Sequence, residues 1–368
     1  MLSRQFKRFA STKRVVVCPG QGQFSTGHLY QLSKFSNLPQ VLKVLDEVDA
    51  KLPEIELSKY IRNPDKLLND SKSIETLQKT SIQQPMLILS SHLTKIIYDS
   101  IYGIDLLKDA NYMIGHSLGE ITSLVLQDTI PWHKGVELAY NRGKLMENLI
   151  QDSPTTLGDK YSMQALLFQP THFKIIIQEL EKLNVNISNF NNYQQVVISG
   201  LENELNDKLS ELRKWLADSK IWKTRIRAVD LNVSIPFHHP ILQSIEPELT
   251  TLFNNATSES LGDLKIPVFS CLNGELTTDI NTQIENIIKV TSKPVKFLNC
   301  LENFQIGSGG LLEHGDNVEF IHFGGSTFNI TEKFYGDFLK LKKEAGLPTN
   351  YKNYAVDDMD TIKDLYSK

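Results

Sequence analysis

The chain has 368 residues, of which 40% are hydrophobic and 22% charged, a composition typical of a globular protein. Its formal net charge of -4 gives no overall basic field of the kind that binds nucleic acid. No apolar run approaches the roughly 18 residues that a membrane span needs. Three cysteines without a Cys-x-x-Cys pair argue against a disulfide scaffold or a cysteine metal site and fit a reducing compartment.

The first 13 residues differ from the rest of the chain. Basic side chains alternate with apolar ones there, and no acidic residue occurs before Asp46. This profile is typical of a mitochondrial transit peptide, so we expect residues 1–13 to direct the protein to the mitochondrial matrix. The alternative is a basic tail without a targeting role.

Short buried strands and longer helices follow. Residues 15–18 form a β-branched run that ends at Pro-Gly and predicts a strand, and residues 112–114 predict another. Helical spacing of apolar residues predicts helices over 38–52, 81–98, 120–126 and 131–149, with Pro85 in the first turn of the second. This alternation predicts an α/β fold with a parallel sheet and an α/β-hydrolase-like core.

The middle of the chain changes character. Four strands are predicted at residues 162–168, 185–190, 195–198 and 224–229, with helices at 171–183 and 201–217. The order β-α-β-β-α-β is that of the ferredoxin-like unit. We therefore expect a small ferredoxin-like domain at residues 155–230, inserted into a catalytic domain made of residues 14–154 and 231–368.

The remainder resumes the first pattern. Residues 267–271 and 318–323 predict two more buried strands. Residues 254–263 are polar and predict an exposed loop. The charged segment 342–368 is expected to dock loosely on the core.

The strongest chemical signal is a Gly-x-Ser-x-Gly motif at residues 115–119, between a predicted strand and a predicted helix. In that context the motif is a nucleophile elbow, a sharp turn that lifts the hydroxyl of Ser117 out of the sheet. The N-terminus of the following helix favours negative charge that develops on a substrate oxygen. The motif therefore predicts a serine nucleophile, whereas a capping serine in an ordinary turn is the alternative.

A serine hydroxyl needs a base, and the chain has nine histidines. His116 is adjacent to the serine on the same turn and should point elsewhere. His238 lies where the chain returns from the small domain to the main sheet, and His239 fits almost equally well by sequence alone. Weaker candidates are His28 and His322.

Several short segments occur in a fixed order along most of the chain. They are residues 19–22 (PGQG), 84–85 (QP), 115–120 (GHSLGE), 142–146 (RGKLM), 189–191 (NFN), 195–200 (QVVISG) and 233–238 (VSIPFH). In order and spacing they resemble the malonyl-CoA:acyl carrier protein transacylase family, which includes the acyltransferase domains of fatty acid and polyketide synthases. Each segment is a weak signal alone, but the combination is specific.

The resemblance implies a role for each matching residue. Ser117 would attack the thioester, and His238 rather than His239 would be its base. A backbone carbonyl near Ser270 and Cys271 would orient the imidazole in place of an acidic residue. The oxyanion hole would consist of the backbone N–H groups of Gln21 and Leu118.

Arg142 matches the arginine that binds the free carboxylate of malonyl in this family. A guanidinium can hold a carboxylate with two parallel hydrogen bonds, whereas an acetyl group would leave the buried cation unpaired. Residues expected to line the pocket are Met146, Phe237 and Gln84. The sequence departs from the family at Gln23-Phe24 and at His239-Pro240, which leaves the pocket entrance and the role of His239 open.

The resemblance thus implies transfer of malonyl from malonyl-CoA to the phosphopantetheine thiol of acyl carrier protein, in mitochondrial type II fatty acid synthesis. Neither a metal nor a cofactor is expected, and the protein is expected to be a monomer. The resemblance also implies a basic rim for an acidic carrier protein, for which Lys220, Lys223, Arg225 and Arg227 are candidates; a solvated strand face is the alternative for each of them. The competing interpretations are a thioesterase or lipase built on the same elbow and a non-catalytic subunit that binds carrier protein.

Overall fold

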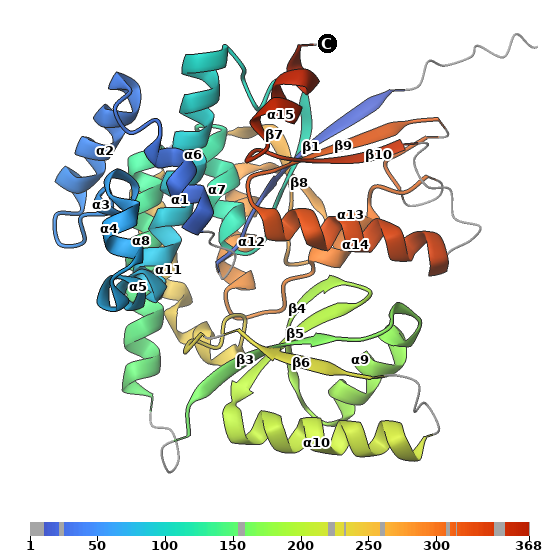
Figure 1. The fold of residues 1–368 in the computed structure, drawn as a ribbon. Helices are drawn as coiled ribbons and strands as arrows, with labels where there is room; N and C mark the ends of the chain where they lie inside the picture. The colour runs from blue at the N-terminus through green and yellow to red at the C-terminus, as the bar shows by residue number, and fades with distance from the viewer. Residues whose placement is uncertain are drawn as a thin grey trace, which may run out of the picture.

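The protein has a larger lobe built on a six-stranded sheet and a smaller lobe built on a four-stranded sheet (Figure 1). Its structure, a computed structural model, describes residues 11–21, 26–153, 159–219, 225–231, 233–257, 262–306, 310–313, 315–341 and 350–367. Within these ranges no helix combines the length and apolar character that crossing a membrane requires.

The larger sheet has the strand order β10-β9-β1-β2-β7-β8, and all its pairs are parallel except β7 with β8. Its strands are β1 (Thr12–Cys18), β2 (Ala110–Gly115), β7 (Asp263–Phe269), β8 (Leu276–Asp279), β9 (Asn317–His322) and β10 (Asn350–Ala355). In the inner strand β1, Val16 and Cys18 join one hydrophobic core, while Val15 and Val17 join another. Burial on both faces explains why this strand is a continuous apolar run.

Helices cover both faces of this sheet. The face of Val16 packs against α6 (Thr80–Tyr102), α7 (Leu118–Leu126), α8 (Trp132–Asp152), α11 (Glu246–Ala256) and α12 (Ile280–Val290). The opposite face packs against α13 (Phe297–Glu302) and α14 (Gly325–Leu341). The other helices of the larger lobe are α1 (Thr26–Ser33), α2 (Pro39–Lys51), α3 (Lys59–Arg62), α4 (Pro64–Leu68), α5 (Ser71–Gln78), α15 (Met359–Tyr366) and the 3-10 segment η3 (Pro240–Ile245).

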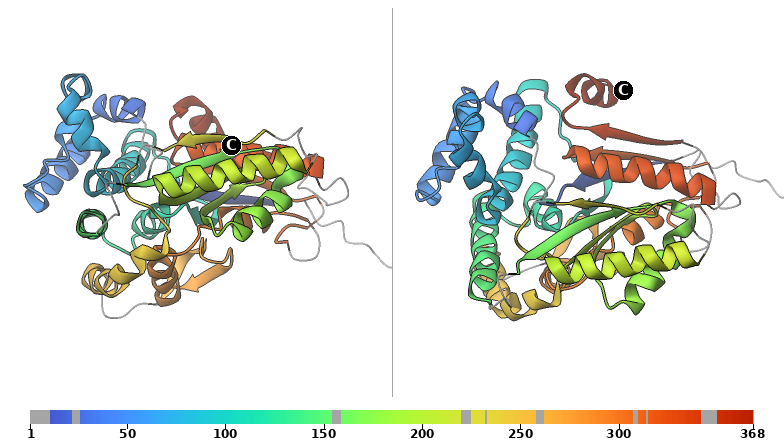
Figure 2. Two further views of the ribbon diagram at one scale, coloured as in Figure 1. Left: turned by 90° about the horizontal axis from the view of Figure 1, so that it is seen from below. Right: turned by 60° about the horizontal axis from the view of Figure 1, so that its bottom comes forward.

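The smaller sheet is antiparallel with the order β4-β5-β3-β6. Its elements are β3 (Tyr161–Leu167), η2 (Pro170–His172), α9 (Phe173–Lys182), β4 (Asn186–Asn192), β5 (Gln195–Leu201), α10 (Glu202–Asp218) and β6 (Arg227–Asp230). The predicted β-α-β-β-α-β order is confirmed. Leu166 and Ile198 pack under the two helices, while Ala165 and Val197 face the other way, as strand alternation requires. The helix α10 lies on the side of this sheet away from the larger lobe (Figures 1 and 2).

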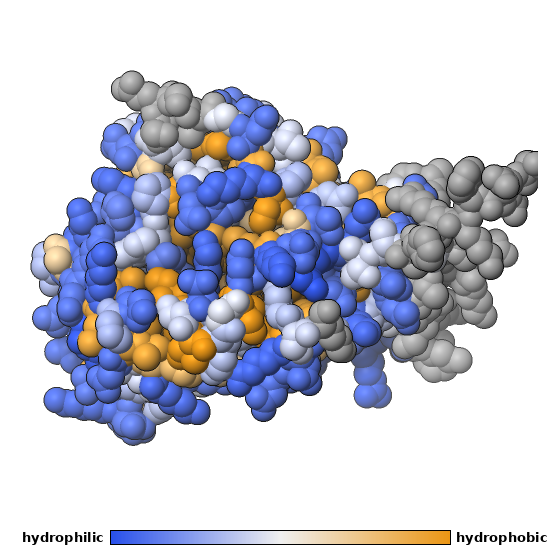
Figure 3. All heavy atoms as spheres, turned by 90° about the horizontal axis from the view of Figure 1, so that it is seen from above, coloured by the Kyte–Doolittle hydropathy of each residue, from blue (hydrophilic) through white to orange (hydrophobic). Residues whose placement is uncertain are grey.

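The surface of the described residues is mixed. On the face seen from above, hydrophilic side chains interrupt the hydrophobic areas (Figure 3). The large hydrophobic side chains that are exposed among the described residues are Ile74, Ile101, Leu231, Leu276 and Leu311. They come from separate segments, and single exposed apolar side chains of this kind are normal for a protein surface.

Two predictions of local structure are wrong, and the bounds of a third are too wide. Pro85 lies inside α6, beyond its first turn, because the helix begins at Thr80 after the extended residue Lys79. The predicted polar loop at residues 254–263 overlaps the end of α11 and the start of β7, and its residues 258–261 lie outside the described residues. The C-terminal segment does not dock loosely, since β10 pairs with β9 along its whole length and α15 follows it.

Candidate active site

The turn between β2 and α7 holds Ser117 in a strained backbone conformation, with φ 54° and ψ −111°. Two glycines permit this turn. A Cβ on Gly115 would lie 2.1 Å from the backbone nitrogen of Glu120, and a Cβ on Gly119 would lie 2.3 Å from the carbonyl oxygen of Cys18. The predicted strand–elbow–helix context is therefore present, and the small residues around the serine have a steric reason.

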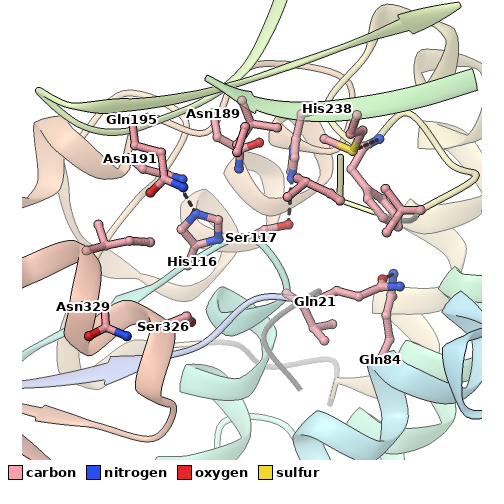
Figure 4. A pocket seen from close by; sticks show the side chains of 18 of the residues that line it. Gln21, Gln84, His116, Ser117, Asn189, Asn191, Gln195, His238, Ser326 and Asn329 are labelled. Atoms are coloured by element: carbon pink, nitrogen blue, oxygen red, sulfur yellow. Dashed lines mark hydrogen bonds between the residues drawn. The ribbon is translucent and has the colours of Figure 1, made fainter. Parts of the chain in front are cut away.

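The structure brings Ser117 and His238 together from distant parts of the chain (Figure 4). The serine Oγ lies 2.8 Å from Nε2 of His238. On the other side of the ring, Nδ1 lies 2.6 Å from the carbonyl oxygen of Val290. Because a carbonyl can only accept, Nδ1 carries the proton and Nε2 is free to take one from the serine.

The orienting carbonyl was expected near Ser270 and Cys271, and that expectation is wrong. The carbonyl belongs to Val290, the last residue of α12. A helix C-terminus has carbonyls without intrahelical partners, so it can supply such an acceptor. Cys271 instead donates its thiol to the carbonyl of Gly115 at 2.9 Å and its backbone N–H to Glu120 Oε1 at 3.0 Å. These two bonds of Cys271 stabilise the nucleophile elbow at residues 115–120.

His238 is 3% exposed, and burial lowers the pKa of its imidazole to about 3. The Val290 carbonyl opposes this shift, whereas the positive field of Arg142 adds to it. The imidazole is therefore neutral and able to accept a proton across the physiological pH range. The backbone of His238, like that of Ser117, is left-handed, with φ 60°.

The remaining histidine candidates lie in other settings. His239 accepts a hydrogen bond from the backbone N–H of Ile241 and so caps η3. His116 turns its ring towards Asn191, with Nε2 2.9 Å from the amide oxygen (Figure 4). His28 pairs with Asp357 and Thr94, and His322 with Thr327 and Asn353. None of the four has a hydrogen bond to Ser117 among the described residues.

Gln21 and Leu118 both line the cavity around Ser117. Leu118 is the first residue of α7, where a backbone N–H has no intrahelical acceptor. Gln21 follows the turn at Gly20, which is packed against His116 so closely that a Cβ would lie 2.6 Å from its carbonyl oxygen. Both residues line the cavity that holds Ser117, and their role as oxyanion-hole donors stays a prediction.

Arg142 reaches the cavity from α8 and is only 3% exposed. The helices α6 and α8 touch at Gly143, where a Cβ would lie 2.5 Å from Cα of Ser81. This contact brings Arg142 next to Gln84, and Nη1 donates to Gln84 Oε1 at 2.9 Å. The arginine Nε has no partner among the described residues. Burial lowers the pKa of Arg142 from 12.5 to about 10, against the field of Glu120.

Glu120 is a buried acid that the sequence analysis gave no role. It is 0% exposed, and its Oε1 accepts hydrogen bonds from Cys271 N–H and from Gln283 Nε2, both at 3.0 Å. Burial raises the pKa of its carboxyl group to about 8, and Arg142 opposes the shift. Its position in the sequence GHSLGE was a visible signal, but its partner Gln283 comes from α12, 163 residues further along the chain.

The cavity has a volume of about 310 Å³ and two kinds of wall besides the catalytic residues. The small sheet and the segment after it give an apolar wall that includes Ala165, Val197 and the predicted Phe237. A polar wall consists of Asn189, Asn191, Gln195 and one stripe of α14, formed by Ser326, Asn329 and Lys333. The sequence analysis missed this stripe, although its spacing of three and four residues after Gly324-Gly325 was visible.

Of the other predicted lining residues, Gln84 lines the cavity and Met146 does not. Met146 is 0% exposed in the hydrophobic core, and its sulfur lies 3.7 Å behind Nε2 of Gln84. The described residues include no group of three or more His, Cys, Asp or Glu side chains that could hold a metal ion. Arg225 and Arg227 are exposed as expected. Lys220, Lys223 and Gln23-Phe24 lie outside the described residues.

An α/β sheet with a serine at a nucleophile elbow, hydrogen-bonded to a buried histidine, defines the class of enzymes that act on acyl groups through a serine. The sequence model of the acyl transferase domain family matches residues 15–303, so the chain belongs to this family. The predicted family resemblance and the predicted acyltransferase activity are confirmed.

Two relatives and one solved structure illustrate the similarity. The malonyl CoA-acyl carrier protein transacylase of Staphylococcus aureus (strain MSSA476) is 27% identical over 291 residues, 79% of this chain and 84% of that protein. The mitochondrial malonyl CoA-acyl carrier protein transacylase of Saccharomyces cerevisiae is 23% identical over 218 residues, 54% of this chain and 59% of that protein. The crystal structure of the transacylase from Clostridium perfringens has a TM-score of 0.70 at 24% identity, with 96% of this chain and 98% of that chain covered. This last likeness shows the fold.

Proposed function

We propose that this protein transfers malonyl from malonyl-CoA to the phosphopantetheine thiol of acyl carrier protein through a malonyl ester on Ser117. The observation that carries the proposal is Arg142, a buried cation in the same cavity as Ser117 and His238. A buried cation favours a substrate with an anionic end, and malonyl is a thioester that ends in a carboxylate. The names of the relatives agree with this substrate.

In the first half-reaction the malonyl carboxylate pairs with Arg142, and Ser117 Oγ attacks the thioester carbonyl. His238 Nε2 takes the hydroxyl proton as the C–O bond forms. The backbone N–H groups of Gln21 and Leu118 hold the oxyanion. The tetrahedral intermediate then collapses, the C–S bond breaks, and His238 returns its proton to the CoA thiolate.

In the second half-reaction the carrier thiol attacks the ester carbonyl and gives its proton to His238. The C–O bond to Ser117 breaks, and the proton passes back to the serine oxygen, so the enzyme is restored without a metal or cofactor. The exposed Arg225 and Arg227 are proposed to attract an acidic carrier. Lys333, an exposed cation at the outer end of the α14 stripe, is proposed to face the phosphate of the arm.

The cellular setting is part of the proposal. We propose that residues 1–13 direct the protein to the mitochondrial matrix, where it supplies type II fatty acid synthesis. The acid-free basic start and a mitochondrial relative support this location. Thr12 and Lys13 are the first residues of β1, so a cut leaves that strand whole only if it lies before them. A fluorescent protein fused behind residues 1–13 should enter mitochondria, and one fused behind the same residues with Arg4 and Arg8 changed to Glu should not.

The domain division and the oligomeric state are also proposals. All strands of the smaller sheet lie between Tyr161 and Asp230, which supports an inserted domain at residues 155–230 within 14–154 and 231–368. We propose that the protein is a monomer. Light scattering after gel filtration should give the mass of one chain.

The main test is the intact mass of purified protein mixed with malonyl-CoA. Wild type should gain one malonyl group and lose it when carrier protein with its phosphopantetheine arm is added, with malonyl then on the carrier. Ser117→Ala should gain none. Release of free malonate without carrier would instead favour a thioesterase or lipase. Full transfer by Ser117→Ala would favour a non-catalytic subunit.

A further inference from the structure

Four side chains form a continuous chain of hydrogen bonds from the substrate end of the cavity to the start of α6. Arg142 Nη1 donates to Gln84 Oε1 at 2.9 Å, and Gln84 Nε2 donates to Gln21 Oε1 at 2.9 Å. Gln21 Nε2 then donates to Thr80 Oγ1 at 3.1 Å. Figure 4 shows the side chains of Gln21 and Gln84 next to each other. We call these four residues the Gln84 chain.

The amide of Gln84 can lie in one orientation only. Its oxygen faces the guanidinium of Arg142, which has donors and no acceptor. Its nitrogen faces two acceptors, Gln21 Oε1 and Met146 Sδ. A flipped amide would set its NH₂ group against the N–H of Arg142. Since Gln84 is 0% exposed, water cannot replace a lost partner, and a buried donor or acceptor left alone is costly.

The Gln84 chain links two parts of the site with different tasks. Arg142 is the proposed binding group for the acyl carboxylate, and the backbone N–H of Gln21 is a proposed oxyanion donor. The side chain of Gln21 is held at both ends, by Gln84 at its oxygen and by Thr80 at its nitrogen. Holding the side chain also fixes the backbone that carries it, in a turn that leaves the sheet after β1.

We propose that Gln84 is a positioning residue that sets both the guanidinium of Arg142 and the oxyanion-donating turn at Gln21. This inference rests on the proposed malonyl transfer and adds a coupling to it. Recognition of the acyl end and stabilisation of the oxyanion then depend on one amide. A residue that only positioned Arg142 would affect malonyl and leave other acyl groups unchanged. A residue that also positions Gln21 affects the chemical step with every acyl-CoA.

The experiment compares acylation of Ser117 by malonyl-CoA and by acetyl-CoA, measured by rapid quench and intact mass. Gln84→Leu removes both polar contacts of the amide. Gln84→Glu keeps the volume and the acceptor towards Arg142 but loses the donor to Gln21. In both variants the maximal acylation rate should fall roughly 10- to 100-fold with acetyl-CoA as well as with malonyl-CoA, the range for a lost hydrogen bond to a group that acts in the transition state.

A matched control is Gln127→Leu, which removes another buried glutamine of the larger lobe. Gln127 accepts from the backbone N–H of Ile266 and lies outside the cavity of Ser117, so this variant should acylate at the wild-type rate. A double-mutant cycle gives a second readout. Gln21→Leu combined with Gln84→Leu should cost little more than Gln84→Leu alone, because both substitutions break the same chain.

The outcomes separate this inference from the proposed function. If wild type forms no malonyl adduct, the proposed function fails and the coupling is not at issue. If wild type is acylated but the acetyl rate of Gln84→Leu stays at the wild-type value, Gln84 acts on Arg142 alone and the coupling is refuted. Additive losses in the double-mutant cycle would refute it as well.

Discussion

Replacing Arg142 by alanine tests the part of the site that selects the acyl group. A hydrogen bond to a charged group contributes about 1.5–3 kcal/mol, so two bonds to the malonyl carboxylate contribute roughly 3–6 kcal/mol. Without them, kcat/KM for malonyl-CoA should fall by about 10²- to 10⁴-fold. With acetyl-CoA the rate should not fall, because the variant no longer buries an unpaired cation beside a methyl group. The preference for malonyl over acetyl should therefore collapse by the same factor.

The variant should keep its fold, and the structure indicates why. Burial lowers the pKa of Arg142 from 12.5 to about 10. This shift means that the buried charge destabilises the folded state by roughly 3 kcal/mol, and the substitution removes that destabilisation. Against this, Gln84 Oε1 loses its donor at a cost of roughly 1–3 kcal/mol. The two effects partly cancel, and the cavity left by the buried side chain adds a further cost, so the melting temperature should fall while unfolding stays cooperative.

The assay is single-turnover acylation with malonyl-CoA and acetyl-CoA, followed by intact mass, with thermal unfolding of the same samples. Arg213→Ala removes an exposed arginine on α10 and should match wild type. Arg142→Lys should be intermediate, because an ammonium cannot form the parallel pair of bonds. If Arg142→Ala is still selective for malonyl, the buried guanidinium does not recognise the diacid and the reasoning is refuted.

Four further outcomes are expected. His238→Ala should lower kcat about 10²- to 10⁴-fold with an unchanged circular dichroism spectrum, and a loss below about tenfold would rule out its role as base. Since burial holds the pKa of His238 at about 3, the acylation rate should stay nearly constant between about pH 7.5 and 5.5. A base with the ordinary imidazole pKa would lower the rate about tenfold over this range. An inflection of the rate near pH 6.5 would contradict the prediction. The stability of the fold should fall on acidification, because burial lowers the pKa of His92 and His322 to about 4. Together with His238, these imidazoles stay neutral in the folded protein below about pH 6.5 and bind a proton only when it unfolds. Glu120 has the opposite effect, because burial raises its pKa to about 8 and it releases its proton on unfolding, which cancels the uptake by one imidazole. The free energy of unfolding by urea should thus drop by roughly 3 kcal/mol per pH unit between about pH 6 and 5, and a flat profile would contradict the sign. Ending the chain before Asn350 removes the edge strand β10 and the carbonyl of Val356 that accepts from Tyr98, so the protein should lose cooperative unfolding. The control Tyr366→Phe loses one hydrogen bond to Leu106 and should lower the free energy of unfolding by only about 1 kcal/mol.

The sequence predicted the parts of the fold whose signals are local. The apolar run of β1 and the elbow at residues 115–119 could be predicted because burial on both faces and the crowding around Ser117 leave few alternatives. The order of predicted strands and helices between residues 162 and 229 predicted the smaller sheet. The strand β10 was missed because an edge strand with polar side chains (NYKNYA) has the composition of a surface tail.

The chemistry of the site could be predicted only where it depends on a side chain. The carbonyl of Val290 was misplaced because every residue has a carbonyl, and only the fold decides which one meets His238. The choice between His238 and His239 needed the family resemblance, since it depends on a left-handed backbone at one of two adjacent imidazoles. The Gln84 chain could not be predicted because it joins residues from three separate segments.

Both Ser117 and His238 have positive φ angles, a conformation that disfavours every residue except glycine and costs about 1–3 kcal/mol per position. Glycine would relax the chain at either site but has no reactive group to offer. Ser117→Gly should therefore melt at a higher temperature than the wild-type enzyme while it is inert, whereas His238→Gly would also lose a buried ring and its bond to Val290. In this protein the catalytic activity requires strained backbone at Ser117 and His238, and this strain lowers the thermal stability. Substitutions that stabilise the enzyme without loss of activity are therefore best sought elsewhere in the molecule.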